Sequence, residues 1–260
     1  MKISVITCTF NSARYLEKNI SSVKNQSFKN FEHVFIDGMS TDGTLDIIKK
    51  YQTEFPERVK FFQFAPGGIS RAMNQGIEKA SGEYLIHLHS DDSFFDGEVL
   101  NDVAKFLEAN NNPDWIYGQI NVLSGEESRG FFPVRKIWQK SERKNCKSYL
   151  LKFYNYIPHQ AVFIKKSVFD KFGNFDETIK CGMDPDLWLR IRAKTRWLFF
   201  RRVISNFSIR PDAQSSGLKN KSANERNYLT VRKRHLNKLE LIVANLVNGL
   251  IKLKNSNYQK

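Results

Sequence analysis

The sequence predicts an α/β fold in which helices cover a mainly parallel central sheet. Short apolar runs rich in β-branched residues alternate along the first half of the chain with segments of helical periodicity. Strands that alternate with helices of about 10 to 15 residues form βαβ units, and the consecutive strands of such units lie parallel. The length of 260 residues suits one large domain, or one domain with a small appendage.

Each predicted strand combines a short length with β-branched or aromatic residues, which favours strand over helix. The predicted strands are ISVITCTF at 3–10, FEHVFIDG at 31–38, VKFFQF at 59–64, EYLIHLHS at 83–90, DWIYGQINVL at 114–123 and AVFIKK at 161–166.

The predicted helices lie between these strands or follow them. Apolar residues recur in them at helical spacing, and glycine, asparagine or proline marks several of their ends. They span 12–26, 41–55 (with a capping threonine or aspartate), 69–82, 97–111, 167–173 and 184–194. Periodicity weakens over 124–156, where no element is predicted.

Cysteine usage and hydropathy bear on the compartment. The three cysteines, Cys8, Cys146 and Cys181, are scattered, which argues for a reducing compartment and against a disulfide framework or a zinc site. Met1 leads directly into a strand pattern, so no signal peptide is expected, and no apolar run approaches the length of a membrane span. A cytoplasmic location is therefore predicted, with attachment to the inner face of the cell membrane as an option.

The net charge of +14 is concentrated near the C-terminus. Residues 201–260 hold 13 Lys and Arg against 3 Asp and Glu, a balance of +10, which leaves +4 for the first 200 residues. This basicity raises one alternative function, a nucleic-acid-binding protein that uses the basic tail and binds with a steep salt dependence. Against it, no recognition motif occurs, and the charge lies in the tail rather than in a groove-reading element. No nucleic-acid partner is therefore expected.

The tail, residues 211–260, is predicted to be a basic amphipathic helical segment. Polar residues recur every seventh position opposite an apolar stripe. The stripe consists of Leu239, Ile242, Val243, Leu246, Leu250 and Leu253, and the polar positions are Lys238, Asn245 and Lys252. Residues 224–255 could lie in an anionic membrane interface. Packing on the chain's own domain or on a second subunit of an oligomer is the alternative, and attachment to the membrane is favoured.

Small and acidic residues gather where the predicted parallel strands end, which is where open α/β sheets bind ligands. They are Thr7, Thr9, Asn11, Asp37, Gly38, Ser40, Asp42, Pro66, Gly67, Gly68, Ser90, Asp91 and Asp92. Any one of them could be an ordinary turn residue, but four strand ends of this kind together favour a site. No GxxxxGK[ST] or GxGxxG motif follows the first strand, so phosphates would need a cation, an arginine or helix N-termini. Asp91 and Asp92 could supply oxygens to Mg²⁺ or Mn²⁺, and Arg71 could reach the same phosphates.

Four segments in order resemble the family 2 glycosyltransferases, inverting enzymes with a GT-A fold, and especially the bacterial branch that builds surface polysaccharides. The segments are SVITCTFN, FIDGMSTDGT, GISRAMNQGIEKASGEYLIHLHSDD and FDETIKCGMDPDLWLR, and the resemblance covers about residues 1–200. It implies a GT-A domain over 1–210, with a nucleotide-sugar-binding half at 1–123 and an acceptor-binding half at 124–210.

The resemblance also implies roles for residues that bind the donor. Thr9 and Phe10 would line the nucleoside pocket, and Asp37 would hydrogen-bond the base, most often uracil. Arg71 stands where many members contact the diphosphate. Asp91 and Asp92 match the DxD-like element, with Asp92 as the metal ligand.

On the acceptor side, Asp184 stands at the position of the catalytic base. Asp186 is a rival two residues on, and residues so spaced on a helix point in different directions. His159 and Arg190 are candidate acceptor-side residues.

Two residues depart from the family pattern. His89 replaces the first aspartate of the DxD-like element, and Met183 replaces the acid that commonly precedes the base.

The implied reaction moves a sugar from a nucleoside-diphosphate donor, with UDP favoured, to a hydroxyl of a glycan or lipid-linked acceptor in cell-envelope polysaccharide synthesis. Mn²⁺ or Mg²⁺ is the implied cofactor. A nucleotidyltransferase on a similar fold would need a glycine-rich basic signature near the first strand, which TCTFNSARY does not provide.

Overall fold

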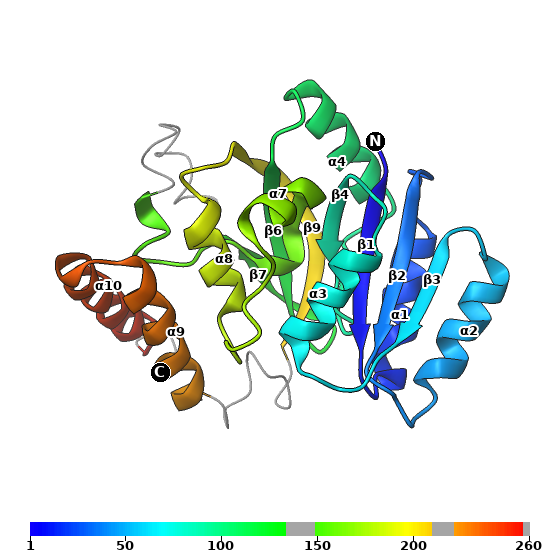
Figure 1. Ribbon diagram of the computed structural model, residues 1–260, viewed down its shortest axis with the longest axis horizontal. Coiled ribbons are helices and arrows are strands. Elements are labelled where there is room, and N and C mark those ends of the chain that lie inside the picture. The colour runs from blue at the N-terminus through cyan, green and yellow to red at the C-terminus, as the bar shows by residue number, and fades with distance from the viewer. Residues whose placement is uncertain (134–148, 210–220, 257–260) are drawn as a thin grey trace.

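A computed structural model describes residues 1–133, 149–209 and 221–256. Within these ranges the strands form one nine-stranded sheet in the order β3-β2-β1-β4-β8-β6-β9-β5, with β7 paired to β6 (Figure 1). The strands are β1 (Ile3–Thr9), β2 (Phe31–Asp37), β3 (Val59–Gln63), β4 (Tyr84–His87), β5 (Ser93–Phe94), β6 (Trp115–Ser124), β7 (Glu127–Phe132), β8 (Val162–Lys165) and β9 (Trp197–Ile209).

The sheet is largely parallel, as predicted, but its second half is mixed. β3, β2, β1 and β4 pair in parallel, β8 is antiparallel to both β4 and β6, and β6 is parallel to β9. The sequence pattern did not predict β5, β7 or β9. β9 is only half-buried along most of its length and β7 is mostly exposed, so neither carries the strong apolar pattern on which the prediction relied.

Helices cover both faces of the sheet. The apolar residues of α1, α2 and α4 pack on one face, and those of α3, α7 and α8 pack on the other (Figure 1). The helices are α1 (Ala13–Lys24), α2 (Thr44–Glu54), α3 (Ile69–Lys79), α4 (Val99–Ala109), α7 (Lys166–Phe172), α8 (Met183–Ile191), α9 (Lys221–His235) and α10 (Lys238–Ser256), and a 3₁₀ turn η1 spans His159–Ala161.

A stack of three tryptophans fixes α8 against the sheet. The ring of Trp115 on β6 lies 5.3 Å from that of Trp188 on α8 and 4.7 Å from that of Trp197 on β9. Gly118 on β6 allows the neighbouring strand to approach closely, because a Cβ there would lie 2.4 Å from Ile204 and 2.7 Å from the Arg202 carbonyl oxygen. This packing sets the position of the helix that carries the predicted base.

The two C-terminal helices lie at the end of the molecule opposite α2 and pack on the domain (Figure 1). α9 lies against α8. α10 is joined to the segment before η1 by an ion pair between Lys152 and Glu240, and Phe153 in that segment packs with Ala244 of α10 and with Leu236, which lies between α9 and α10. Within the described ranges, no helix combines the length and the apolar character that crossing a bilayer requires.

Some sequence predictions lie outside the described residues. They are residues 134–148 and 210 of the acceptor half, with Cys146, residues 211–220 and 257–260 of the tail, and the side chains of Leu250, Lys252 and Leu253.

Candidate active site

The carboxyl ends of the first three strands meet around one buried carboxylate, that of Asp37. Thr9, Asp37 and Gln63 lie in register on adjacent parallel strands. Asp37 Oδ1 accepts hydrogen bonds from Thr9 Oγ1 at 2.8 Å and Ser40 Oγ at 2.5 Å. Its Oδ2 accepts from the Ser40 backbone N–H at 2.8 Å and from Gln63 Nε2 at 3.2 Å. Asp37 therefore orders the rim in which the sequence placed the nucleoside pocket.

The turn that carries the paired acids is held against the same rim. Ser90 Oγ donates to Ser12 Oγ at 3.1 Å, which joins the end of β4 to the residue before α1. Asn19 Nδ2, on α1, donates to the carbonyl oxygens of His89 at 2.9 Å and Asp92 at 3.1 Å. The fourth strand end thus joins the others, as the spacing predicted.

Two exposed apolar side chains flank Asp37. Phe10 is 60% exposed and Met39 is 55% exposed. Met39 has a positive φ of 62°, which is uncommon for a residue other than glycine and often accompanies a functional site. A Cβ at Gly38 would lie 3.2 Å from the Phe10 ring, so glycine gives this ring room. Phe10 was predicted as a nucleoside contact, but Met39 was missed, because nothing in a single sequence indicates its backbone conformation.

Arg71 lies at the same edge of the sheet, on the first turn of α3 just after β3. Its exposed side chain runs along the backbone of Gly67, where a Cβ would lie 2.4 Å from Arg71 Cδ. The next residue back, Ser70, donates to the carbonyl oxygen of Ile179 at 3.4 Å. This contact brings the segment that leads into α8 close to the start of α3.

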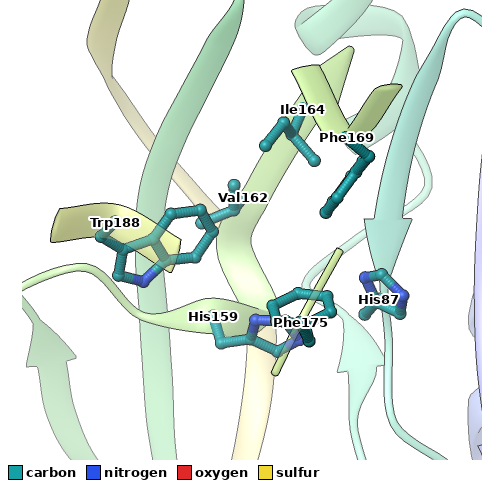
Figure 2. Close-up of a pocket in the computed structure, with 7 residues that line it drawn as sticks. All are labelled: His87, His159, Val162, Ile164, Phe169, Phe175 and Trp188. Atoms are coloured by element: carbon teal, nitrogen blue, oxygen red, sulfur yellow. The ribbon is translucent and has the colours of Figure 1, made fainter. Parts of the chain in front are cut away.

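A cluster of aromatic rings connects the paired acids to α8. The ring of His159 lies 5.5 Å from those of His87 and His89, 5.8 Å from Phe175 and 6.4 Å from Trp188. Figure 2 shows His159 beside Phe175, between Trp188 and His87. The space that these rings help to line is too small to hold a water molecule. This cluster was missed at the sequence level, apart from His159 itself.

Burial keeps these histidines neutral. It lowers the pKa of His87 to about 3, lowers that of His89, and, together with the two neighbouring histidines, lowers that of His159 well below its usual value. Both ring nitrogens of His159 are buried, and neither has a hydrogen-bond partner among the described residues. The acceptor-side role predicted for His159 stays a prediction.

We expect the free energy of unfolding to fall as the pH drops from 7 to 5. In the unfolded chain histidines bind protons near pH 6.5, whereas burial lowers the folded-state pKa of both His33 and His87 to about 3. Each such histidine removes up to about 1.4 kcal/mol per pH unit below 6.5. Asp184 acts in the opposite direction, because its pKa is raised to about 7 in the folded state, and it offsets the effect of one histidine in this pH range but not of all of them.

Urea denaturation at pH 7, 6 and 5 measures how the free energy of unfolding changes with pH. His159→Phe should flatten it, and a wild-type slope of zero would contradict the expectation.

The two acids at the start of α8 have different surroundings, as expected for residues two apart on a helix. Asp184 is half-buried and lies one turn before Trp188, so the two share the face that packs toward His159. Burial raises the pKa of Asp184 to about 7. Asp186 is buried, and burial alone would raise its pKa, but a hydrogen bond from His235 and the nearby Arg190 lower it below the usual value.

Arg190 is engaged in holding α8 in place. Its guanidinium donates to Asp186 Oδ2 at 3.0 Å. It also donates to the carbonyl oxygens of Phe172 at 2.7 Å, Gly173 at 3.2 Å and Asn174 at 2.7 Å. These contacts account for much of its hydrogen-bonding capacity, and the acceptor-side role predicted for it stays a prediction.

The paired acids suit a hard divalent cation whose remaining ligands are supplied by the phosphates of a substrate. Asp91 is half-buried and Asp92 is buried, next to each other in one turn. Among the residues that the structure describes, no group of three or more His, Cys, Asp or Glu could hold a metal by itself. Mg²⁺ and Mn²⁺ commonly use one or two carboxylates together with substrate phosphates, so these two acids are a sufficient protein contribution.

Known proteins resemble this chain over most of its length. The model of the family described as glycosyl transferase family 2 matches residues 4–173. A PGL/p-HBAD biosynthesis glycosyltransferase of Mycobacterium tuberculosis is 30% identical over 205 residues, which are 78% of this chain and 70% of that protein. An uncharacterized glycosyltransferase of Rickettsia typhi is 24% identical over 214 residues, 82% of this chain and 65% of that one.

Solved structures confirm the predicted fold. Staphylococcus aureus TarS 1–349, in complex with UDP-GlcNAc, superposes on this chain with a TM-score of 0.72 and a sequence identity of 24%. The superposition covers 89% of this chain and 65% of the TarS chain. The mannosyltransferase PcManGT of Pyrobaculum calidifontis, in complex with GDP-Man and Mn²⁺, gives a TM-score of 0.66 at 15% identity over 95% of this chain and 69% of that one.

Proposed function

The chain belongs to glycosyl transferase family 2, and from this premise we propose that it is an inverting enzyme that uses a nucleoside-diphosphate sugar. We propose a UDP-sugar as the donor and a hydroxyl of a cell-envelope glycan or lipid-linked glycan as the acceptor. One observation supports the proposal: the rim ordered by Asp37 is bonded to the turn with two carboxylates, and the ring of His159 connects this turn to α8, the helix on which Asp184 lies.

The donor would lie along the carboxyl ends of β1 to β4. Asp37 fixes Thr9 by hydrogen bonding, and Phe10 offers an exposed ring against which a planar base can stack. In this arrangement Asp37 binds the nucleobase of the donor either directly or through the backbone turn that it orders. Arg71 would meet the diphosphate from the first turn of α3, where its fixed charge and fork of donors suit phosphate oxygens.

Asp92, with Asp91 beside it, would hold Mn²⁺ or Mg²⁺, which neutralises charge on a diphosphate leaving group. The two acids are adjacent in a partly buried turn, where a cation would offset their like-charge repulsion and desolvation.

The proposed reaction is a single displacement in which Asp184 is the general base. The carboxylate takes the proton of an acceptor hydroxyl while that oxygen bonds to the anomeric carbon, and the bond from this carbon to the diphosphate oxygen breaks. The pair of electrons from the broken bond leaves with the nucleoside diphosphate. A base works best when its pKa lies near the working pH, and burial raises the pKa of Asp184 to about 7.

The test of this proposal is transfer itself. The enzyme is mixed with UDP-, dTDP- and GDP-sugars and a glycolipid extract of bacterial envelopes, and release of the nucleoside diphosphate is followed. We expect one nucleotide class to support release, and the transferred sugar to have the anomeric configuration opposite to that of the donor by NMR. Retention of configuration would rule out the single displacement.

We favour this function over nucleic-acid binding because two arginines of α9 already bond to groups of the same chain. Arg232 donates to the carbonyl oxygen of Phe153 at 3.1 Å, and Arg234 pairs with Asp176 at 2.6 Å. Fewer cations of this helix therefore remain available for phosphate contacts.

We also propose that α10 attaches the enzyme to the inner face of the cell membrane. One side of the helix packs on the domain through Ala244. The other side is apolar and exposed, with exposed fractions of 71% for Leu239, 57% for Ile242 and 64% for Leu246. The exposed Lys238 begins this helix, and an apolar face beside basic residues suits an anionic bilayer surface.

Replacing Ile242 and Leu246 together with aspartate should lower binding to phosphatidylglycerol-containing vesicles at least about tenfold, because two large apolar side chains leave the lipid. Vesicle flotation measures the bound fraction. Asn245→Asp, which adds charge on the exposed polar side of the same helix, is the control and should change binding much less. Unchanged flotation of the double variant would contradict attachment through this face. A wild-type dimer in light scattering that the double variant loses would instead assign the face to a second copy.

A further inference from the structure

The sequence placed α9 in a tail outside the catalytic domain, yet this helix contacts the start of α8 on two sides. On the first side, His235 Nε2 donates to Asp186 Oδ1 at 2.8 Å, while Arg190 occupies Asp186 Oδ2. Asp186 is buried, with 4% of its surface exposed. One buried carboxylate thus joins α9 to α8.

On the second side, α9 covers the first turn of α8. A Cβ placed at Gly182, the residue before α8, would lie 3.8 Å from the ring of Tyr228 and 3.8 Å from Val231. Val231 is 1% exposed. Asp184 lies two residues after Gly182, in the turn that these side chains cover.

The charge of Asp184 acts on two titratable groups near it, Cys181 and Tyr228. Cys181 precedes α8, and its thiol has a pKa raised by burial and by Asp184. Tyr228 on α9 has a pKa raised by burial, Asp184 and Cys181, and partly lowered by Arg232. Tyr228 is therefore a neutral phenol at working pH and adds no charge near Asp184.

We propose that α9 is a positioning element of the catalytic site: His235 anchors α8 through Asp186, and Tyr228 shields its first turn so that Asp184 works in a water-poor environment. Neither residue is assigned contact with the substrate. The anchoring also explains why two acids so close in sequence differ in role, because Asp186 is committed to His235 and Arg190. The inference rests on the proposed function only in taking Asp184 as the base.

The test follows the carboxyl group of Asp184 directly, in protein labelled with ¹³C at the aspartate carboxyl carbon. The Asp184 resonance is identified by its loss in Asp184→Asn, and its chemical shift is recorded from pH 4.5 to 8.5. We expect a midpoint near 7 in the wild type. Tyr228→Ala should lower the midpoint by about one pH unit or more, because water then reaches the carboxylate. Leu229→Ala, which truncates the exposed neighbour on α9, should leave it unchanged.

Tyr228→Gln is the second variant, in case the alanine variant does not fold, since it keeps bulk but admits water. A wild-type midpoint near 4, or a wild-type midpoint retained in either folded Tyr228 variant, would overturn the shielding role. The titration needs no substrate, so it separates this inference from the proposed function. An inactive enzyme with the expected titration would count against the function alone.

The anchoring role of His235 is tested by rescue. His235→Ala removes the donor to Asp186 and should lower kcat several-fold with the donor KM unchanged. His235→Gln can still donate a hydrogen bond and should recover most of the loss. Equal activity of the alanine variant and the wild type, or equal loss in both variants, would overturn this role.

Discussion

Asp184→Asn is expected to lower kcat by about 10²- to 10⁴-fold while leaving the affinity for the nucleoside diphosphate unchanged. Asparagine has nearly the same shape but cannot accept the acceptor proton. Asp184 lies on α8, whereas the predicted donor contacts lie at the ends of β1 to β4. Initial rates of nucleotide release measure kcat, and thermal unfolding with added nucleotide measures binding.

The same variant should be at least as stable as the wild type at pH 8. Burial raises the pKa of Asp184 to about 7, so above pH 7 the folded state holds a carboxylate that it disfavours, and a neutral amide removes that cost. Asp170→Asn, at an exposed position on α7, is the control and should retain full activity. Near-normal turnover of Asp184→Asn would remove Asp184 from the role of base.

Asp37→Asn should lower the free energy of unfolding by about 2–4 kcal/mol and abolish nucleotide binding. Both carboxylate oxygens of Asp37 accept two hydrogen bonds each, from Thr9, Ser40 and Gln63. In one orientation the N–H₂ of an amide faces the Ser40 N–H and the Gln63 amide, which are donors. In the other orientation it faces the hydroxyls of Thr9 and Ser40, which must turn to accept, so either orientation weakens the rim. Chemical denaturation and nucleotide-dependent thermal shifts measure the two effects.

The matched control is Asp46→Asn, because Asp46 is an exposed acid on the first turn of α2. We expect its effect on stability to stay within about 0.5 kcal/mol. A stable Asp37→Asn protein that still binds nucleotide would show that the hydrogen bonds of Asp37 are not what orders this rim.

The first half of the fold was predictable because its signals are local. β1 to β4 and α1 to α4 are strongly patterned elements, and the parallel topology then places their carboxyl ends together. β9 was not predictable in this way. It is half-buried over most of its 13 residues and carries Arg201 and Arg202 in its middle, so its sequence lacks a clear alternation.

For the site, sequence pattern predicted the strand-end residues but not the contacts between distant segments. Thr9 and Asp37 follow from topology, whereas the contact of His89 with His159 joins residues far apart in sequence. The position of α9 against α8 depends in the same way on long-range packing. Asp186 illustrates the limit: its sequence neighbours suggest a rival base, and only its bonds to His235 and Arg190 show that it is committed elsewhere.

The most direct test of the central claim is thermal unfolding of the wild type and Asp92→Ala with UDP, dTDP and GDP, each with and without Mn²⁺. A ligand that binds only the folded state raises the unfolding midpoint in a concentration-dependent way. We expect UDP to raise the midpoint of the wild type only when Mn²⁺ is present, and Asp92→Ala to lose this shift. No shift with any nucleotide, or an unchanged Mn²⁺-dependent shift in Asp92→Ala, would contradict a nucleoside-diphosphate site built on the paired acids.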